Sequence, residues 1–487
     1  MPKNKFYLIF VPFILTGCNV NGAHTGGNSN NENDDYIIKE DVTIDFLSMA
    51  NSDYLKRLQS YIDEFEKMEP HVKVNLYNPL GSGNYTLLEK IIVSGFFKED
   101  YPDIAQCYPD NVVKYIAQGY AVKLDNYLNN DKYGINAGED KDDYISSFMD
   151  EGSKYPVEGT YSLPFCKSTE LMYYNADALI GLDLSNVNAS INNGNPLDEE
   201  YLNDLTWEEL FEELCPAIKT YNDSLDDEEK IMVDNDNSAV FTYDSDDNFF
   251  ITLAEQHGYG YTSMDEEGKG SIDFDNPEMK ELVKKLKIAK DNKYLQTKGT
   301  YRDYVSDLFQ NRECLFTISS TAGLSYNYSE KNPFKIGVAK IPHAEGKNYV
   351  AINQGPSVCI LDHKNENRSL ASYLLWKHIT SKKNSSDWAL YTGYMGIRHS
   401  SYETDEYKAA IENVDASDLK ALAAAENLKK IAEVRELTFN TPVFRGSGNA
   451  RSNVSALLKE CLLSEDLDNE IDDLFKSYSD DTEKYLK

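Results

Sequence analysis

Residues 42–107 read VTIDFLSMANSDYLKRLQSYIDEFEKMEPHVKVNLYNPLGSGNYTLLEKIIVSGFFKEDYPDIAQC. The first six residues alternate between apolar and polar types, which predicts a strand, and residues 72–76 repeat the alternation. Between them, apolar residues over 55–65 recur every three or four positions, as on one face of a helix. A second helical segment over 85–97 leads to a short apolar run at 104–107. This order of strands and helices predicts βαβ units and a parallel sheet.

Polar residues stand at the ends of these predicted elements. Residues 51–53 (Asn-Ser-Asp) precede the first helix and are typical N-cap residues. Ligands of parallel sheets bind at the carboxyl ends of the strands. We therefore expect ligand contacts within 48–51, 81–85 and 108–111.

The rest of the chain contains both kinds of pattern and no internal repeat. Its 487 residues correspond to about two to three domains, each able to bury its own core. Helices are predicted at 207–217, 276–291, 370–380 and 419–434, and strands at 314–318, 336–339 and 357–361.

The charge balance excludes two classes of partner. Lys and Arg number 48 against 82 Asp and Glu, which gives a net charge of −34. Nucleic acid binding needs clustered basic residues that neutralise phosphates, and docking on anionic lipid needs polybasic stretches. We therefore expect no nucleic acid partner. The acidic excess is typical of a soluble, self-repelling surface.

The N-terminus has the order of a secretory leader. Lys3 and Lys5 precede an apolar run at 6–15, which is shorter than the ~20 residues that span a bilayer. This order predicts a signal peptide over residues 1–17. The sequence Leu-Thr-Gly-Cys that ends at Cys18 resembles a bacterial lipobox, in which the cysteine is lipidated and becomes the mature N-terminus. The alternative is a chance cysteine in a leader.

Residues 18–38 are predicted to form a flexible tether behind the lipid. Gly and Asn are frequent in this stretch and apolar periodicity is absent. We expect the protein to be anchored by Cys18 to the extracytoplasmic face of the cell membrane. Removal of the leader would take two lysines and leave a net charge of −36.

Other motifs argue against cofactor, metal and catalytic chemistry. The six remaining cysteines form no CxxC pair, so we expect buried thiols, with one or two disulfides left open. The chain contains no P-loop, no HExxH and no GxSxG motif. Residues 234–237 (Asp-Asn-Asp-Asn) begin like a calcium loop but lack its glycine, which favours a solvated acidic loop over a calcium site. We expect no enzyme, no cofactor and no metal.

The segment Leu163–Asn175, LPFCKSTELMYYN, resembles a signature of the extracellular solute-binding proteins of carbohydrate-type ABC importers. Other blocks agree with that family in order and spacing, and the resemblance covers nearly the whole chain after the tether. These blocks lie at 46–70, 101–110, 308–324, 353–360 and 387–403.

The resemblance implies an α/β fold of the two-lobed, type II periplasmic-binding-protein kind. Each lobe would hold a mostly parallel sheet flanked by helices, and the ligand would lie in the cleft between the lobes. We expect the first lobe to comprise 39–145 with 316–364, and the second 146–315 with 365–487. The implied function is capture of a sugar or sugar-like solute by a monomer and its delivery to the ABC permease, without chemistry.

Within this family the chain is most similar to the members that bind glycerol 3-phosphate. Matched position by position, Tyr85, Ser168, Ser320 and Gly355 correspond to cleft residues, and Thr169 belongs to the same motif as Ser168. The alternative for Ser168, Thr169 and Ser320 is a turn role. For Gly355 it is an ordinary turn glycine.

Sugar sites combine carboxylates, amides and aromatic faces. Asp110, at a predicted strand tip, is our candidate acceptor for a hydroxyl group, and its alternative is a helix N-cap. Tyr85 and Tyr108 are candidates for stacking or hydrogen bonding. Because the chain has 35 tyrosines, packing remains the alternative for each.

Arg445 and Arg451 flank a glycine-rich turn near the C-terminus, and guanidinium groups suit phosphate. The alternative is ion pairing with nearby acids. The ligand therefore stays open between a sugar and a glycerophosphate or other phosphorylated polyol. Two other classes of function also stay open: a surface adhesin or antigen that has lost transport, and an extracellular glycoside hydrolase.

Overall fold

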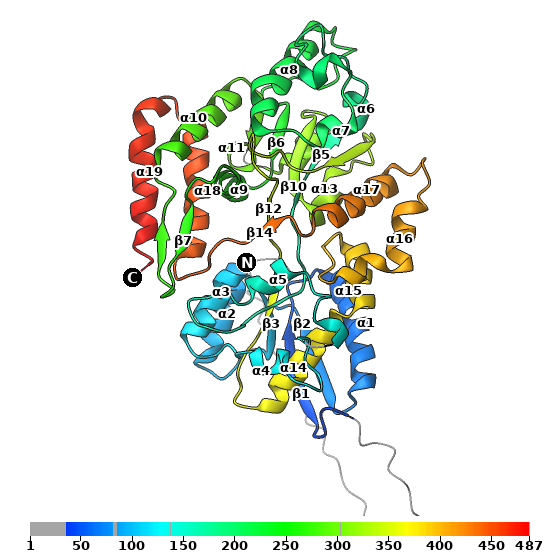
Figure 1. The fold of residues 1–487 in the computed structure, drawn as a ribbon, viewed down its shortest axis with the longest axis vertical. Coiled ribbons are helices and arrows are strands. Elements are labelled where there is room, and N and C mark those ends of the chain that lie inside the picture. The colour runs from blue at the N-terminus through cyan, green and yellow to red at the C-terminus, as the bar shows by residue number, and fades with distance from the viewer. Residues whose placement is uncertain (1–35, 81–84, 137, 302, 487) are drawn as a thin grey trace, which may run out of the picture. The chain divides into compact units, whose positions relative to one another are not determined.

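The structure is a computed structural model that describes residues 36–80, 85–136, 138–301 and 303–486 (Figure 1). Residues 38–487 form one compact unit. The predicted signal peptide, Cys18 and residues 19–35 of the tether lie outside the described residues. Residues 81–84 of the second predicted strand tip lie outside them as well.

The first lobe is built on a five-stranded sheet. In spatial order its strands are β2 (Val72–Tyr77), β1 (Val42–Leu47), β3 (Ile104–Cys107), β13 (Ser357–Ile360) and β4 (Leu163–Pro164). β1 pairs in parallel with β2 and β3, whereas β13 is antiparallel to its neighbours. The helices of this lobe are α1 (Ser52–Met68), α2 (Tyr85–Phe96), α3 (Pro109–Ala117), α4 (Asp125–Leu128), α5 (Ser146–Glu151), α14 (Glu366–Ile379) and α15 (Lys382–Thr392).

The first predicted strand and helix are confirmed with their cap. The Oδ1 atom of Asn51 accepts hydrogen bonds from the backbone N–H groups of Asp53 and Tyr54 at 3.1 and 2.9 Å. These bonds satisfy donors that the first turn of α1 leaves unpaired. The helix then buries Leu58 and Phe65 within the first lobe, as the helical spacing predicts.

The second lobe is built on another five-stranded sheet. Its strands, in spatial order, are β11 (Ile336–Ala339), β5 (Glu170–Asn175), β10 (Phe316–Ser320), β6 (Phe241–Tyr243) and β9 (Leu295–Thr297). β10, β6 and β9 are parallel, and β5 is antiparallel to both of its neighbours. The helices of this lobe are α6 (Ala176–Leu179), α7 (Glu199–Leu202), α8 (Cys215–Ser224), α9 (Asp246–His257), α10 (Pro277–Asp291), α11 (Lys298–Tyr301), α12 (Val305–Gln310), α13 (Leu324–Asn327), α17 (Leu419–Val434), α18 (Ser447–Leu463) and α19 (Leu467–Glu483).

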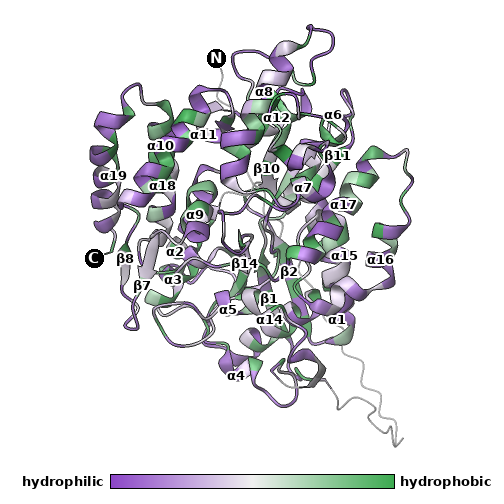
Figure 2. Cartoon of the chain, turned by 45° about the horizontal axis from the view of Figure 1, so that its top comes forward, coloured by the Kyte–Doolittle hydropathy of each residue, from purple (hydrophilic) through white to green (hydrophobic). Residues whose placement is uncertain are grey.

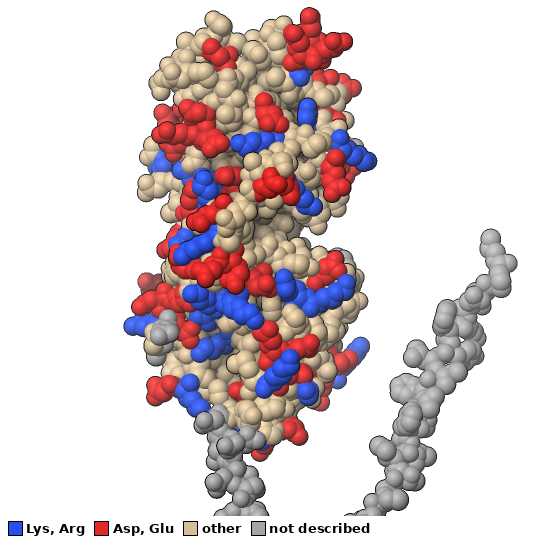
Figure 3. Space-filling model, turned by 90° about the vertical axis from the view of Figure 1, so that its right-hand side faces the viewer, with Lys and Arg blue, Asp and Glu red and all other residues tan. Residues whose placement is uncertain are grey.

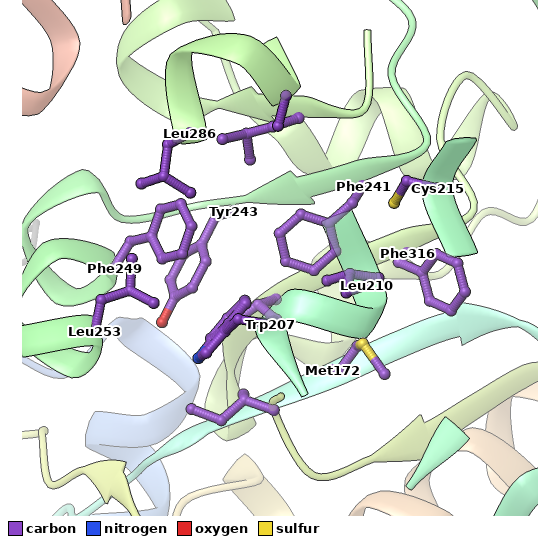
Figure 4. Packing of buried hydrophobic residues seen from close by; sticks show 14 of the residues in the cluster. Met172, Trp207, Leu210, Cys215, Phe241, Tyr243, Phe249, Leu253, Leu286 and Phe316 are labelled. Atoms are coloured by element: carbon purple, nitrogen blue, oxygen red, sulfur yellow. The ribbon is translucent and has the colours of Figure 1, made fainter. Parts of the chain in front are cut away.

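Aromatic side chains fill the core of the second lobe (Figure 4). Trp207 lies between strand and helix residues, with its ring centroid 6.2 Å from that of Phe241 and 5.4 Å from that of Phe249. The Tyr243 ring stacks on Phe249 at 4.4 Å. All four residues are at most 3% exposed. This packing holds the end of β6, at Tyr243, against α9.

One strand in each sheet runs against the others, and each is entered from the opposite lobe. Residues 165–169 lead from β4 to β5, and residues 353–356 lead from β12 (Ala351–Ile352) to β13. β12 also pairs in parallel with β14 (Thr438–Phe439) in a two-stranded sheet. The predicted α/β fold of two lobes, each with a mostly parallel sheet, is confirmed.

The sheets correct the predicted lobe boundaries. β10 and β11 were expected in the first lobe but pair with β5 in the second sheet. β4 and α14 were expected in the second lobe, yet β4 pairs with β13, and α14 packs against β1. The prediction fails here because a lobe change needs only a few extended residues, which differ little in composition from an ordinary loop.

The surface and the cysteines agree with the composition. Hydrophilic and hydrophobic residues alternate along outer helices such as α10 and α19 (Figure 2). Acidic and basic side chains intermingle on the face shown in Figure 3.

The six cysteines outside the N-terminal region are all buried free thiols, so no disulfide forms in the described part of the chain. None of the described helices has both the length and the apolar character needed to cross a bilayer.

Candidate functional site

The carboxyl ends of three parallel strands in the second lobe meet at a cavity of about 630 Å³. Asp244 follows β6, Lys298 follows β9, and Ser320 ends β10. This volume is typical of a pocket for a small molecule. The cavity is lined by Asp244, Lys298, Tyr304, Val305, Ser306, Asp307, Gln310, Ser319, Ser320, Ala322, Gly323, Tyr326, Asn327 and Tyr394.

Asp244 is the most distinctive polar group of this cavity. Within the described residues, its carboxylate makes no hydrogen bond or ion pair. Burial raises the pKa of Asp244 to about 7; Lys298 counteracts the rise, and Asp247 and Asp246 add to it. An acceptor of this kind can bind a donor from a ligand.

Tyrosines form much of the wall. Tyr304 and Tyr326 are 66% and 69% exposed, so their ring faces are accessible. Tyr394 follows α15 of the first lobe, and burial raises its pKa well above the usual value. The cavity is therefore lined from both lobes, with aromatic surface and hydroxyl groups side by side.

Behind the cavity lies a buried carboxyl group, Glu170, at the start of β5. It is 0% exposed and accepts hydrogen bonds from the Tyr243 hydroxyl and, at 2.9 Å, from the Asn248 amide. Burial raises the pKa of Glu170 to about 8, although the bond from Tyr243 lowers it. At neutral pH this group is mostly a neutral acid, so it adds little charge to the cleft.

Of the predicted arginines, Arg451 is already engaged. Its Nη1 atom donates to Asp247 at 2.8 Å and to Asn248 at 2.6 Å. Burial works against the charge, but Asp247 raises the pKa of Arg451 above its usual value. Arg445 is exposed, and neither arginine lines the cavity. Arg451 thus takes the ion-pair role that the sequence left open.

The predicted tyrosines of the first lobe lie together. The rings of Tyr85 and Tyr108 meet edge to face, with centroids 4.7 Å apart. Burial raises the pKa of Tyr108 to about 12 and that of Tyr85 well above its usual value, with Tyr394 among the groups that add to the rise at Tyr85. These two residues therefore stand near the first-lobe wall of the cavity. Tyr108 itself is 36% exposed.

Asp110 connects the first lobe to α18. It lies in the first turn of α3, whose N-cap is Tyr108, so the N-cap alternative for Asp110 is wrong. The Ser447 hydroxyl, from α18, donates a hydrogen bond to its Oδ1 atom. Asp110 is therefore partnered by the second lobe, and it does not line the cavity.

Ser168, Thr169 and Gly355 lie where the chain passes between the lobes. Ser168 exchanges two backbone hydrogen bonds of 2.9 Å with Gln354, and the Thr169 hydroxyl donates to the carbonyl oxygen of Ile352 at 2.9 Å. Gly355 has a φ of +89°, and a Cβ atom there would lie 2.0 Å from the carbonyl oxygen of Cys166. These residues join the crossing segments to each other, and only Ser320 of the predicted motif residues lines the cavity.

A buried ion pair lies at the same crossing. Lys167 and Glu151 are 0% and 5% exposed and bond to each other. Lys167 also donates to the carbonyl oxygen of Gly355 at 3.1 Å, and Glu151 accepts from Ser357 at 3.0 Å. We name this group, with Asn353 and Asn440, the crossover hub. Asn353 donates to Asn440 at 2.6 Å, which ties the segment after β14 to the other two.

Sequence reasoning missed Asp244, Lys298 and the tyrosines of the second lobe. Asp244 and Lys298 each follow a strand that runs parallel to β10 and that, at three residues, is too short to give a clear sequence signal. The strand over 241–243 is only three residues long and lies against an acidic stretch. The rule that ligands bind at strand ends was applied to the first sheet alone.

Comparisons with known proteins agree with this architecture. The chain is 23% identical over 393 residues to the sn-glycerol-3-phosphate-binding periplasmic protein of Pectobacterium atrosepticum, covering 77% of this chain and 78% of that one. UgpB of Mycobacterium tuberculosis, solved in complex with glycerophosphocholine, superposes with a TM-score of 0.67 at 16% identity, covering 91% and 98% of the two chains. The sugar-binding protein MalE of Xanthomonas citri gives 0.65 at 17% identity, with coverage of 91% and 98%.

A family model settles the relationship. It describes bacterial extracellular solute-binding proteins and matches residues 60–414, which is well over half of the chain. The match includes the second sheet, every strand of the first sheet except β1, the crossing segments and the residues that line the cavity. This chain belongs to the family of bacterial extracellular solute-binding proteins.

Proposed function

We propose that the chain is the solute receptor of an ABC importer. It captures a sugar or sugar-like solute in the cavity between the lobes, closes by a hinge motion and presents the solute to the permease without chemical change. The observation that carries this proposal is the cavity at the ends of β6, β9 and β10, which combines free polar groups with tyrosine faces.

The chemistry of the lining fits a solute rich in hydroxyl groups. A hydroxyl group both donates and accepts, so it can bond to the Asp244 carboxylate and to the Lys298 ammonium group. The C–H faces of a sugar ring pack against aromatic side chains such as Tyr304 and Tyr326. Both residues are accessible, and the volume of about 630 Å³ admits more than one sugar ring.

A glycerophosphate is the second candidate ligand, because one relative named for glycerol 3-phosphate is similar in sequence and one solved with glycerophosphocholine is similar in fold. Against it stands Arg451, whose guanidinium group is bonded to Asp247 and Asn248. A phosphate would have to displace these partners or bind at Lys298 alone. The arrangement of charges therefore favours the sugar.

The cell location follows from the N-terminal sequence. We propose that Cys18 carries the lipid, that residues 18–38 tether a monomeric receptor to the extracytoplasmic face of the membrane, and that residues 1–17 are removed. In cells that express the full chain, incorporation of a radioactive fatty acid tests this. Label should enter the protein and should be absent after Cys18→Ala; label that persists in the variant would contradict the anchor.

Thermal unfolding with a ligand panel tests the binding role. At a hundred times its Kd, a ligand that binds only the folded state stabilises it by about 2.7 kcal/mol. The panel comprises maltose, maltotriose, glycerol 3-phosphate and glycerophosphocholine. A rise in Tm with one of these, together with compaction in small-angle scattering, is the expected result.

Two rival classes predict different outcomes. An adhesin or antigen that has lost transport would show no shift with any small solute. A glycoside hydrolase would release the dye from a chromogenic glycoside, whereas the receptor should bind without turnover. Either result would replace the proposed function.

A further inference from the structure

Asp244 and Lys298 are neighbours because of strand register. Tyr243 of β6 pairs in parallel with Thr297 of β9, so the next residue of each strand emerges at the same sheet edge. Adjacent strands are about 4.8 Å apart. A carboxylate and an ammonium group therefore begin side by side at the rim of one cavity, which both line.

The two groups do not satisfy each other. No ion pair within 4.0 Å joins them, and neither bonds to another side chain among the residues that the structure describes. Lys298 extends toward Tyr304, with its Nζ atom 5.7 Å from the ring centroid. A free acceptor and a free donor at this separation can both contact a ligand that carries neighbouring hydroxyl groups.

The other carboxylates near this pair already accept hydrogen bonds or form ion pairs. Asp246 accepts hydrogen bonds from the Thr297 hydroxyl at 2.6 Å and from the Gly299 backbone at 2.8 Å. Asp247 is paired with Arg451. These two carboxylates are therefore held by other groups, whereas Asp244 lines the cavity together with Asp307 and with one lysine, Lys298. Above the Asp244 pKa of about 7, a phosphomonoester, with nearly two negative charges, would meet repulsion at this point.

We propose that Asp244 and Lys298 are the specificity-determining pair of the cavity: together they bind neighbouring hydroxyl groups of an uncharged polyol, and Asp244 excludes phosphomonoesters. This inference rests on the proposed function, because it concerns the ligand of the same cavity. It assigns the choice between sugar and phosphate to a second-lobe carboxylate, and not to the arginines near the C-terminus.

Isothermal titration at pH 8, where Asp244 is mostly ionised, tests the pair. The wild type, Asp244→Asn and Lys298→Met are titrated with maltose, maltotriose, glucose 6-phosphate and glycerol 3-phosphate. Each substitution should weaken binding of the better neutral sugar about tenfold or more, since Asp244→Asn turns a hydrogen bond to a charged group into a neutral one and Lys298→Met removes the charged donor. Asp244→Asn should in addition strengthen binding of at least one phosphate. Exposed Asp236, also in the second lobe, supplies the control Asp236→Asn, which removes the same charge away from the cavity and should change neither affinity.

The outcomes separate the pair from the receptor role. If Asp244→Asn or Lys298→Met binds the sugar with the affinity of the wild type, the specificity pair is wrong and the receptor role stays intact. A wild type that prefers a phosphate probe over both sugars does the same. A wild type that binds no probe overturns the proposed function and this inference with it. Because Lys298 is exposed, Lys298→Met keeps the test valid if Asp244→Asn does not fold.

Discussion

The crossover hub and the cavity use polar groups in opposite ways. In the hub, the buried charges of Glu151 and Lys167 bond to each other and to Ser357 and Gly355. In the cavity, Asp244 lines an open space without a bonded partner among the described residues. Satisfied buried charges hold backbone segments in place, whereas unsatisfied ones are costly unless a ligand pairs with them. The difference separates residues that position the cleft from residues that can bind.

This comparison changes the meaning of the family motif. Ser168, Thr169 and Gly355 were predicted as ligand contacts, but their described bonds join one crossing segment to another. Direct contact between Ser168 or Thr169 and the solute stays a prediction. The motif is expected to matter first for the geometry of the hinge.

Removal of the hub's cation should have the largest effect. Lys167→Met leaves Glu151 as an unpaired buried charge, and breaking a buried pair in this way costs about 3–5 kcal/mol. We expect a decrease of that size in the free energy of unfolding, measured by urea denaturation. The double variant Glu151→Gln/Lys167→Met should recover part of the loss, because it leaves no buried charge.

The matched control is Lys476→Met, which breaks an exposed pair with Asp480 on α19. Exposed pairs contribute about 0–1 kcal/mol. If Lys167→Met were as mild as this control, the hub would not be the rigid region that the comparison describes.

The next largest effect is a change of stability with pH. It comes from Glu170, the buried carboxyl group at the start of β5. Its folded pKa is about 8, whereas an exposed glutamate titrates near 4.5. Between these values the unfolded chain has already released a proton that the folded chain keeps, so stability falls as pH rises. At about 1.4 kcal/mol per pH unit, the wild type should lose about 2–3 kcal/mol between pH 6 and pH 8 through this group.

Glu170→Gln should make that part of the profile less steep, because an amide resembles the protonated acid and does not ionise; the contribution of Asp244, whose pKa is raised to about 7, remains. Urea denaturation at pH 6 and pH 8 measures the difference. The exposed Glu228 supplies the control Glu228→Gln, which should keep the slope of the wild type. Parallel profiles for wild type and Glu170→Gln would show that Glu170 is ionised in the fold.

A glycine pair tests the close approach of the crossing segments. Gly355→Ala combines a positive φ with a Cβ atom 2.0 Å from the Cys166 carbonyl oxygen, so backbone must move. Gly346→Ala has a φ of +68° with no atom within 4 Å of its Cβ, and it should cost about 1 kcal/mol from strain alone. We expect Gly355→Ala to cost at least about 2 kcal/mol and to weaken solute binding. Equal losses in the two variants would mean that the crossing segments are loosely packed.

How much of the fold could be predicted from the sequence differs from one element to the next. β1, α1 and β2 were predictable because period-2 and period-3.6 patterns run long enough to be distinct, and Asn51 marks the helix start. β6 and β9 have three residues each, too few for a period. Their positions depend on pairing with β10, which lies far away in the sequence.

The site was only partly predictable for the same reason. Ser320 was predicted from its motif and lines the cavity, whereas ligand contact by Tyr85 and Tyr108 stays a prediction. Asp244 lies in an acidic stretch of the sequence. Only the fold shows that its carboxylate lines a cavity without a bonded partner among the described residues, whereas many neighbouring carboxylates are solvated. Lobe boundaries were missed because residues 165–169 and 353–356 are too short to carry a signal of their own.

The smallest effects on stability should come from substitutions of the two arginines, which lie outside both the hub and the cavity lining. Arg451→Ala removes the partner of Asp247 while the pair is about one-third exposed, so we expect a loss of about 1–2 kcal/mol. Arg445→Ala, at an exposed position, should stay within about 0.5 kcal/mol. Neither should change the affinity for a neutral sugar more than about threefold, because neither lines the cavity. If Arg445→Ala abolished binding of a phosphate probe while stability stayed constant, the C-terminal arginines would belong with the binding groups, and the cavity described here would be only part of the site.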